Sequence, residues 1–275
     1  MSLASTVARP VVAPVAGLGD QVLFALAVLR SLPEALRRHR AEIGRQIAEV
    51  SLGGGALVVG GGAVGVVFLL ATFTGTEVGI EGHDGLDIIG LAPLTGFISG
   101  YANTRELAPI VVALAFAARI GCGYTSRLGA MRIAEEIDAL EVMSVRPVVH
   151  LVATRLVAAM VVVLPLYLVG LVGTYVTTDW VVTTFYGQSA GTYEHYFTMF
   201  VSLRDVLYSA VKVLVLTMLV TLVHCYHGFH ATGGPEGVGR ATGRAIRTSI
   251  VLITVADIGL TLLLWGPGQS VTVSG

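Results

Sequence analysis

Five long apolar stretches, separated by shorter polar segments, make up most of the chain. A helix needs about 20 consecutive apolar residues to cross the hydrocarbon core of a membrane, and each stretch is long enough. The pattern therefore predicts an all-α polytopic membrane protein whose membrane domain covers residues 52–266. The predicted transmembrane helices cover about 52–73, 88–129, 148–176, 205–226 and 247–266.

The second stretch, 88–129, is longer than one simple crossing requires, and the polar sequence NTREL and Pro109 interrupt it. We interpret it as one long or broken helix, because proline removes a backbone donor from the helical ladder. A re-entrant piece before this helix is an alternative that the sequence leaves open.

The residues before the first stretch divide into two segments. Residues 1–19 contain Pro10 and Pro14 and lack the compact apolar core of a signal peptide, so we expect a flexible tail. Residues 20–50 place apolar side chains on one helical face and arginines on the other, which is typical of an amphipathic helix at a membrane surface. A soluble helix packed on a neighbour is the alternative. The apolar face comprises Leu32, Leu36, Ile43 and Ile47, and the basic face comprises Arg37, Arg38, Arg40 and Arg45.

Arginine is concentrated in three segments, with five residues in 30–45, three in 127–146 and three in 240–247. The segments 74–87 and 177–203 contain neither arginine nor lysine. Cytoplasmic loops are enriched in these residues, and five spans put all three basic segments on one side. We therefore predict a cytoplasmic N-terminus and a C-terminal tail, 267–275, outside.

Composition supports a membrane protein and excludes other classes. Hydrophobic residues make up 54% of the chain and charged residues 13%, against about 25% charged residues in soluble domains. The net charge of −1 gives no basis for binding nucleic acid through bulk electrostatics. The two cysteines, Cys122 and Cys225, form neither a disulfide framework nor a CxxC metal site.

Nucleotide-binding motifs are also excluded. The single lysine, Lys212, lies within the apolar sequence YSAVKVLVL, so a P-loop of the form GxxxxGK[ST] cannot exist. We expect no cofactor on this chain, and any ATP and Mg²⁺ that drive it must be used by a partner ATPase. Gly60, Gly62 and Gly65 match a dinucleotide fingerprint but lie inside the first span. We interpret the small residues there, such as Gly61 and Gly65, as contacts between closely packed helices.

No catalytic or metal-binding arrangement is evident, so we predict that the chain is not an enzyme. The sequence HCYHGFH, 224–230, places His224 and His227 three residues apart, where they could share a helical face and a metal. We favour an anchoring role at the end of a span over this metal site.

Five charged residues lie in or beside the apolar stretches, where charges are rare and usually pair or face a cavity. Three interpretations stay open: pairs that fix helix packing, the lining of a substrate passage, and a proton relay through Asp257 or Glu106. Lys212, Arg119 and Arg155 are candidate partners for Asp257. The five residues are Arg105, Glu106, Arg119, Lys212 and Asp257.

The polar sequence RIAEEIDALEVMSVRP, 132–147, predicts a short amphipathic helix at about 132–146. Ile133, Ile137 and Leu140 share one helical face, and Pro147 ends the helix. The four acids around this stripe would be repelled by an anionic inner leaflet. We therefore predict docking on a protein partner that has a groove for the stripe and basic residues for the acids, with a solvated connector as the alternative.

Two motifs resemble those of the MlaE/YrbE permease family, the membrane subunits of Mla- and Mce-type lipid ABC transporters. The first is NTRELAPIVVALAFAARIGCGYTSRLGAMRIAEEIDALEVMSVRPVVHLVATR, 103–155, and the second is GFHATGGPEGVGRATGRAI, 228–246. The resemblance covers roughly 20–266 and is greatest to an actinobacterial YrbE subunit of an Mce complex.

This resemblance implies a permease subunit in the bacterial inner (plasma) membrane. It implies a dimeric cytoplasmic ATPase, a second YrbE-like permease chain and extracytoplasmic Mce-domain proteins as partners. The substrate would be a hydrophobic lipid such as a fatty acid, a sterol or a phospholipid. The segment at 132–146 would act as a coupling helix that docks on the ATPase. The residues that carry this expectation are Glu135, Glu136, Ile137, Asp138, Ala139, Leu140, Glu141 and Met143.

The chain departs from the family pattern at Arg127, Ser144 and Arg146, where an acid or small residue, a glycine and an acid are usual. These positions flank the coupling helix, so the A-type or B-type identity of the chain stays open. Two functions from other classes are also possible: a proton-coupled secondary transporter that uses Asp257 or Glu106, and a membrane scaffold without transport.

Overall fold

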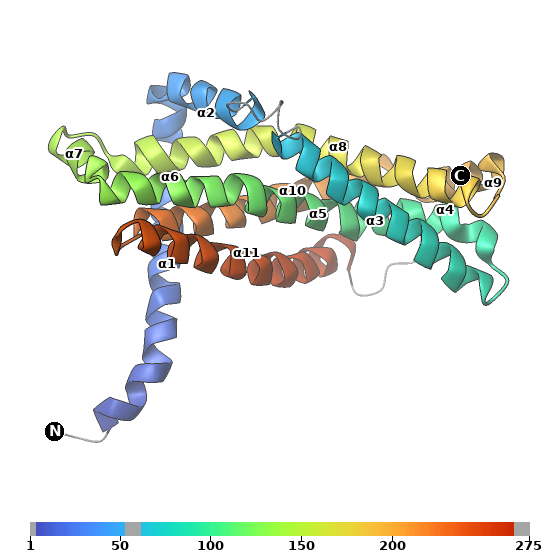
Figure 1. The fold of residues 1–275 in the computed structure, drawn as a ribbon, viewed down its shortest axis with the longest axis horizontal. Helices are drawn as coiled ribbons and strands as arrows, with labels where there is room; N and C mark the ends of the chain where they lie inside the picture. Colours follow the sequence, from blue (N-terminus) through green and yellow to red (C-terminus); the bar gives the residue numbers. More distant parts are fainter. Residues whose placement is uncertain (1–3, 53–61, 267–275) are drawn as a thin grey trace.

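The computed structural model describes the backbone of residues 4–52 and 62–266, and every regular element in these ranges is a helix. Five helical runs are long and apolar enough to cross a membrane, which confirms the predicted all-α polytopic class. They pack side by side as an elongated bundle with short helices at either end (Figure 1). The spans are α3 (Gly62–Asp87), the run from η1 to α6 (Ala92–Ile133), η4 with α8 (Val148–Thr184), α10 (Leu203–Phe229) and α11 (Gly234–Trp265).

The second span is a continuous run whose hydrogen-bonding pattern changes along its length. Residues 88–91 form a turn into it, so the re-entrant piece considered from the sequence is not found there. Pro109 lies in the first turn of α5, directly after a π-helical stretch whose altered ladder accommodates the missing N–H. The pieces are η1 (Ala92–Leu94), α4 (Thr95–Ile98), the π-helix η2 (Ser99–Leu107), α5 (Ala108–Phe116), the π-helix η3 (Ala117–Gly121) and α6 (Cys122–Ile133).

The first span differs from its prediction at the far end. The sequence predicted a span over 52–73 and then an acidic loop, but residues 77–87 continue α3 as a helix. With 26 residues, α3 is about 39 Å long and exceeds the roughly 30 Å hydrocarbon core, so its acidic end can lie outside the core. The predicted start of this span, with Gly60 and Gly61, lies outside the described residues.

Glycines allow α3 to approach α8 closely. A β-carbon at Gly75 would lie 2.6 Å from the carbonyl oxygen of Thr174, and one at Gly79 would lie 2.9 Å from Val181. The hydroxyl of Thr178 donates to the carbonyl oxygen of Gly75 at 2.9 Å. Close packing through small residues, predicted for the start of this helix, is therefore found along its middle.

Two helices precede the bundle, α1 (Ala4–Arg38) and α2 (Arg40–Leu52), and His39 separates them. The sequence predicted a flexible tail over 1–19, whereas α1 already begins at Ala4. Near a membrane, an apolar segment must satisfy its backbone groups internally, which favours helix despite two prolines. α2 packs along α8, and the arginines of the predicted basic face are exposed on both helices.

Short helices lie at the two ends of the bundle. α7 (Glu136–Val142) is at the end where α2 lies, and α9 (Ala190–Phe200) is at the opposite end against α4 (Figure 1). The hydroxyl of Tyr193 in α9 donates to Ser99 at 2.7 Å. In the predicted orientation, α7 is cytoplasmic and α9 is outside. The largest fully buried apolar side chains come mainly from α5, α6, α8 and α10 and include Phe116, Leu128, Leu156, Tyr167 and Leu216.

Candidate functional site

A cluster of charged side chains lies inside the bundle, where η2, α10 and α11 meet. Lys212 is fully buried at its centre. Its ammonium donates to the Glu106 carboxylate at 2.7 Å, to the Thr261 hydroxyl at 2.7 Å and to the Arg105 carbonyl at 2.8 Å. The same nitrogen lies 2.8 Å from the Asp257 carboxylate. One lysine therefore joins three helical segments.

The ammonium of Lys212 has three N–H groups, and three acceptors already receive them. Asp257 is therefore held by the ion pair alone, and its Oδ1 accepts no hydrogen bond from a described residue. Thr261 donates in turn to Glu106 at 2.8 Å, which fixes that carboxylate between α11 and η2.

A second ion pair continues the cluster toward the end of the bundle that carries α9. The guanidinium of Arg105 lies 3.1 Å from the Asp205 carboxylate and 4.3 Å from the centre of the Tyr101 ring. The indole N–H of Trp265 donates to Asp205 at 2.6 Å. Buried charges that are paired in this way resist separation, because removing one partner leaves an unpaired charge.

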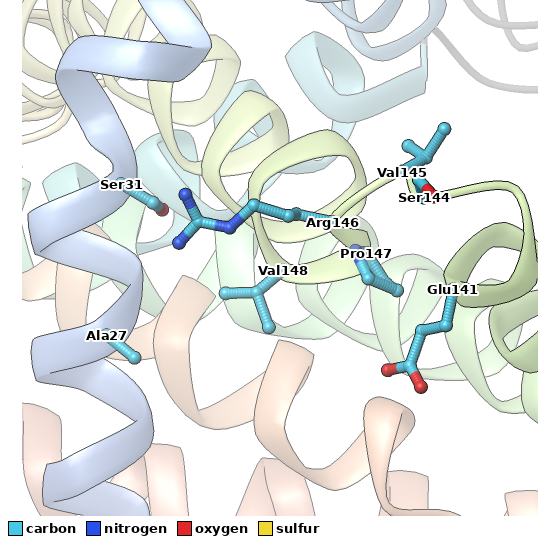
Figure 2. Close-up of a pocket in the computed structure, with 8 residues that line it drawn as sticks. All are labelled: Ala27, Ser31, Glu141, Ser144, Val145, Arg146, Pro147 and Val148. Atoms are coloured by element: carbon cyan, nitrogen blue, oxygen red, sulfur yellow. The ribbon is translucent and has the colours of Figure 1, made fainter.

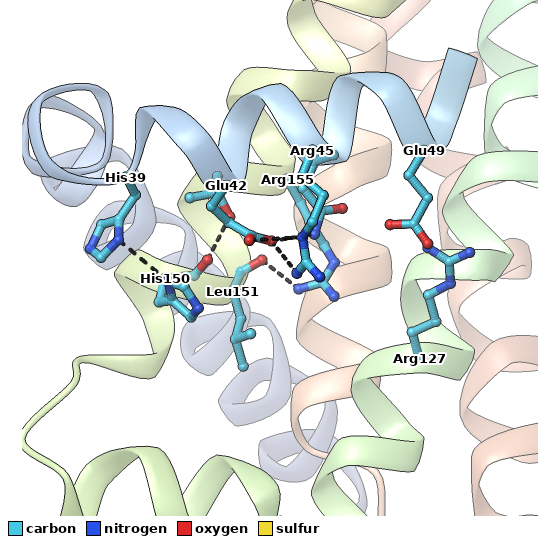
Figure 3. Close-up of polar contacts among 10 residues, drawn as sticks. His39, Glu42, Arg45, Glu49, Arg127, His150, Leu151 and Arg155 are labelled. Atoms are coloured by element: carbon cyan, nitrogen blue, oxygen red, sulfur yellow. Dashed lines mark hydrogen bonds and ion pairs between the residues drawn. The ribbon is translucent and has the colours of Figure 1, made fainter. Parts of the chain in front are cut away.

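Of the five intramembrane charges predicted from the sequence, four belong to this cluster and Arg119 does not. Arg119 is exposed on η3. Arg155, considered as a partner for Asp257, is also elsewhere: it is buried under α2 and donates to the Leu151 carbonyl at 2.6 Å (Figure 3). The geometry supports the interpretation that the charges pair and fix the helices.

The cluster holds more carboxylates than cations. Arg105 and Lys212 face Glu106, Asp205 and Asp257, and Glu106 keeps 33% of its side chain exposed. The excess acid and the partial exposure of Glu106 are compatible with a substrate passage or a proton relay. Part of the cluster lies on the π-helix η2. Such stretches are rare in proteins, and those that occur are often at functional sites.

Sequence reasoning missed Asp205, Thr261 and Trp265. Asp205 lies in the first turn of α10, where Ser202 accepts from its backbone N–H at 3.1 Å, so it resembles an ordinary helix start. Thr261 and Trp265 are uncharged residues inside or at the end of an apolar stretch. Their spacing of four and eight residues from Asp257 on α11 was the available signal.

The second candidate site is α7 with its flanking turns. The backbone of Glu135 has φ of 58° and that of Ser144 has φ of 62°, a region that side chains other than glycine rarely adopt. A glycine at position 144 would adopt this backbone conformation without the strain that serine incurs. Strained residues therefore bracket the helix at both ends.

Two of the three residues of the apolar stripe predicted for a partner face this chain instead, and the third, Ile133, ends α6 and is 38% exposed. Ile137 is fully buried and Leu140 packs partly against the core, while Asp138 pairs with Arg132 at 2.6 Å. The large apolar side chains that α7 and its following turn expose are Val142, at 86%, and Met143, at 64%. The remaining predicted coupling residues, Glu135, Glu136, Ala139 and Glu141, are exposed.

Two hollows flank α7, and Glu141 lines both. The larger, of about 390 Å³, lies between α1 and residues 144–148 (Figure 2). Arg146 reaches toward α1 there and donates to Glu34 at 2.7 Å. The smaller hollow, of about 290 Å³, lies between α7 and the end of α10. Because a hollow lies on each of two sides of α7, a partner can contact much of the surface of this helix.

Polar contacts tie α2 to the same end of the bundle (Figure 3). His39 and His150 place their Nδ1 atoms 3.4 Å apart, and Arg127 on α6 pairs with Glu49. Burial favours a higher pKa for Glu42, but hydrogen bonds from Arg45 and Gln46 outweigh it, and the pKa is lowered from its ordinary value. The Arg127–Glu49 pair links α2 to α6, and the contact between His39 and His150 links the residue before α2 to η4.

The histidines considered as metal ligands have other surroundings. His224 is buried and its Nδ1 lies 2.8 Å from the Thr125 hydroxyl, with Gly121 packed against the ring. Within 4–52 and 62–266, no group of three His, Cys, Asp or Glu side chains could hold a metal ion. His224 therefore contributes to packing between α6 and α10.

Comparison with known proteins agrees with this architecture. A family model described as Permease MlaE matches residues 55–263, a range that includes α7 and nearly the whole charge cluster. A probable ABC transporter permease protein of Rickettsia typhi is 28% identical over 222 residues, which cover 76% of this chain and 81% of that protein.

Two further relatives have more specific names. The intermembrane phospholipid transport system permease protein MlaE of Haemophilus influenzae is 26% identical over 209 residues, covering 74% of this chain and 78% of that protein. The chloroplastic protein TRIGALACTOSYLDIACYLGLYCEROL 1 of Arabidopsis thaliana is 28% identical over 213 residues, covering 76% of this chain and 60% of that protein.

Proposed function

Because the chain belongs to the MlaE permease family, we propose that it is the membrane subunit of an Mce-type ABC lipid transporter. A permease of this family is a multi-pass transporter component and not an enzyme. A separate ATPase binds and hydrolyses ATP with Mg²⁺, and this chain converts the resulting motion into movement of a lipid.

The observation that carries the ATPase coupling is the exposure of α7 at one end of the bundle. Ile137 is buried against the bundle and anchors the helix there, and the Arg132–Asp138 pair fixes its start. On the exposed side, Val142 and Met143 form an apolar patch that acidic side chains surround. An ATPase groove with apolar walls and basic edges is complementary to this surface.

The charge cluster has a supporting role in this proposal. It holds η2, α10 and α11 together, so that these helices move as one body when α7 is displaced. Hydrophobic lipid, such as a fatty acid, a sterol or a phospholipid, passes along the apolar surfaces between this chain and a second YrbE-like permease chain. Mce-domain proteins receive or deliver the lipid outside the membrane.

The test uses the complex purified from its native membrane in mild detergent. Identification of the co-purifying proteins should yield an ATPase, a second permease chain and Mce-domain proteins. The double substitution Glu136→Lys and Glu141→Lys should reduce ATPase association at least tenfold, because it reverses two exposed charges on the docking surface, while membrane insertion is unchanged.

The matched control is Glu81→Lys with Asp87→Lys, which reverses two exposed acids on α3. It should leave ATPase association unchanged, since α3 ends at the opposite side of the bundle. Full ATPase association in the Glu136/Glu141 variant would contradict the coupling role of α7.

A proton-coupled secondary transporter is the second candidate, and the excess of carboxylates in the charge cluster favours it. Transport would then depend on Asp257 or Glu106 exchanging a proton. Lipid movement that continues with an inactive ATPase and stops on adding an uncoupler would support this alternative over the first.

A further inference from the structure

Two histidines connect the joint between α1 and α2 to the bundle. His39 is the single non-helical residue between these helices, and its ring faces that of His150 on the π-helix η4 (Figure 3). Their Nδ1 atoms lie 3.4 Å apart and their ring centroids 5.0 Å apart. Within the part of the chain that the structure describes, neither side chain has another hydrogen-bond partner. The contact between the two rings is therefore the polar link at this joint.

The number of protons on the two rings decides whether this contact can exist. A hydrogen bond between imidazoles needs one nitrogen that donates and one that accepts, so at least one ring must be neutral. If both rings are protonated, two N–H groups point at each other and two positive charges repel across a few ångströms. The closed contact therefore accepts one added proton and excludes a second.

The charges around the pair do not offset a second proton. Glu42 and Arg45 of α2 and Arg155 of α8 face His150. The Glu42 carboxylate already accepts hydrogen bonds at 2.8 Å from Arg45 and at 2.8 Å from Gln46. One occupied carboxylate thus stands against two guanidinium groups, so the surroundings add positive charge to the site.

The same joint has a second polar link to the segment that follows α7. Arg146 donates to Glu34 of α1 at 2.7 Å, and 70% of the arginine side chain is exposed. Exposed ion pairs of this kind contribute little to stability. Arg38 and Arg40, which flank His39, are exposed as well. The histidine contact is therefore the less exposed of the two polar links, and it lies a few residues after α7.

We propose that the contact between His39 and His150 is a pH-sensitive switch that holds the α1–α2 joint against η4 at neutral and alkaline pH and releases it in acid. An imidazole in water has a pKa of about 6.5. Once the contact opens, both rings can be protonated, so the open form binds one proton more than the closed form. The ratio of closed to open form should then fall about tenfold for each pH unit below about 6.5. The proposal goes beyond the transport role and does not depend on ATPase docking.

The test measures the distance between two spin labels by double electron–electron resonance, in the purified full chain in lipid nanodiscs. The labels are attached to Ala41→Cys at the start of α2 and Ser126→Cys on α6, which are exposed positions. Cys122 is replaced by serine, and Cys225 is buried. A single distance is expected at pH 8. A second distance should appear below about pH 6.5, and its ratio to the first should be about tenfold higher at pH 5.5 than at pH 6.5.

Three histidine variants assign the response. His39→Gln and His150→Gln each leave an amide that can hydrogen-bond but does not take up a proton in this pH range. Each should keep the pH 8 distance and lose the change in acid. The matched control is His195→Gln, which removes an exposed histidine from α9 at the opposite end of the bundle and should retain the full change.

Three results would overturn the proposal. The first is the same distance distribution at pH 8 and pH 5.5. The second is a full response to acid in both the His39 and the His150 variant, which would assign the titration to another group such as the Glu42 carboxyl. The third is loss of the pH 8 distance when a metal chelator is added, which would mean that a metal ion joins the two rings.

Discussion

Replacing Lys212 by methionine removes the cation at the centre of the charge cluster while keeping a side chain of similar length. Glu106 and Asp257 then lose the ammonium that is 2.7 and 2.8 Å from their carboxylates. The net charge of the cluster changes from −1 to −2, because two cations faced three acids before the substitution. We expect the folded chain to lose much of its stability.

The magnitude follows from the distances. At 2.8 Å and an effective dielectric constant of about 20, each ion pair is worth about 6 kcal/mol before desolvation. Glu106 is one-third exposed, so water compensates part of its loss, whereas Asp257 is buried. Breaking a buried pair typically costs about 3–5 kcal/mol, and we expect the substitution to fall in this range.

The assay is thermal unfolding of the purified chain in mild detergent. Lys212→Met should lower Tm by on the order of 10 °C. Adding Asp257→Asn should restore about half of the loss, since the double variant no longer buries the unpaired aspartate. Arg204→Met, which removes an exposed arginine near the start of α10, is the control and should change little. A single variant as stable as the unmodified chain, or a double variant with no recovery, would refute the pairing argument.

Two smaller predictions concern the α7 end of the bundle. Ser144→Gly should raise Tm by a few degrees, because it relieves about 1 kcal/mol of strain at φ of 62°, whereas Ser144→Ala should not; equal Tm values would contradict the strain. The lowered pKa of Glu42 means that its bonds to Arg45 and Gln46 stabilise the fold above pH 4.5 and are lost as pH falls through the folded pKa. Unfolding followed from pH 7 to 3 should therefore show Glu42→Gln losing less stability than the unmodified chain, and parallel curves would contradict this.

The number of spans could be predicted because hydropathy depends on composition along a single segment. The π-helical stretches could not, because their hydrogen-bonding pattern depends on what packs around them. The charge cluster was predicted only in part for the same reason. Lys212 and Glu106 are 106 residues apart, and their pairing depends on the packing of two spans.

The α7 segment illustrates a different limit. The spacing of Ile133, Ile137 and Leu140 predicts an apolar stripe, but a stripe does not specify what it packs against. In the structure Ile137 and Leu140 contact the core of the same chain, whereas Ile133 ends α6 and is 38% exposed. Val142 and Met143 are the more exposed apolar side chains of this segment. Burial against a chain's own core and burial against a partner produce the same pattern in sequence, so only the arrangement of neighbouring helices separates them.

The second span is 42 residues long, about twice what a membrane crossing requires. From the level of Arg119 it continues for 14 residues to Ile133, a rigid arm of roughly 21 Å. A tilt of about 10° around η3 would carry the base of α7 sideways by roughly 4 Å. A small rotation at η3 would therefore produce a displacement of several ångströms at α7, because the helix between them transmits and enlarges the motion.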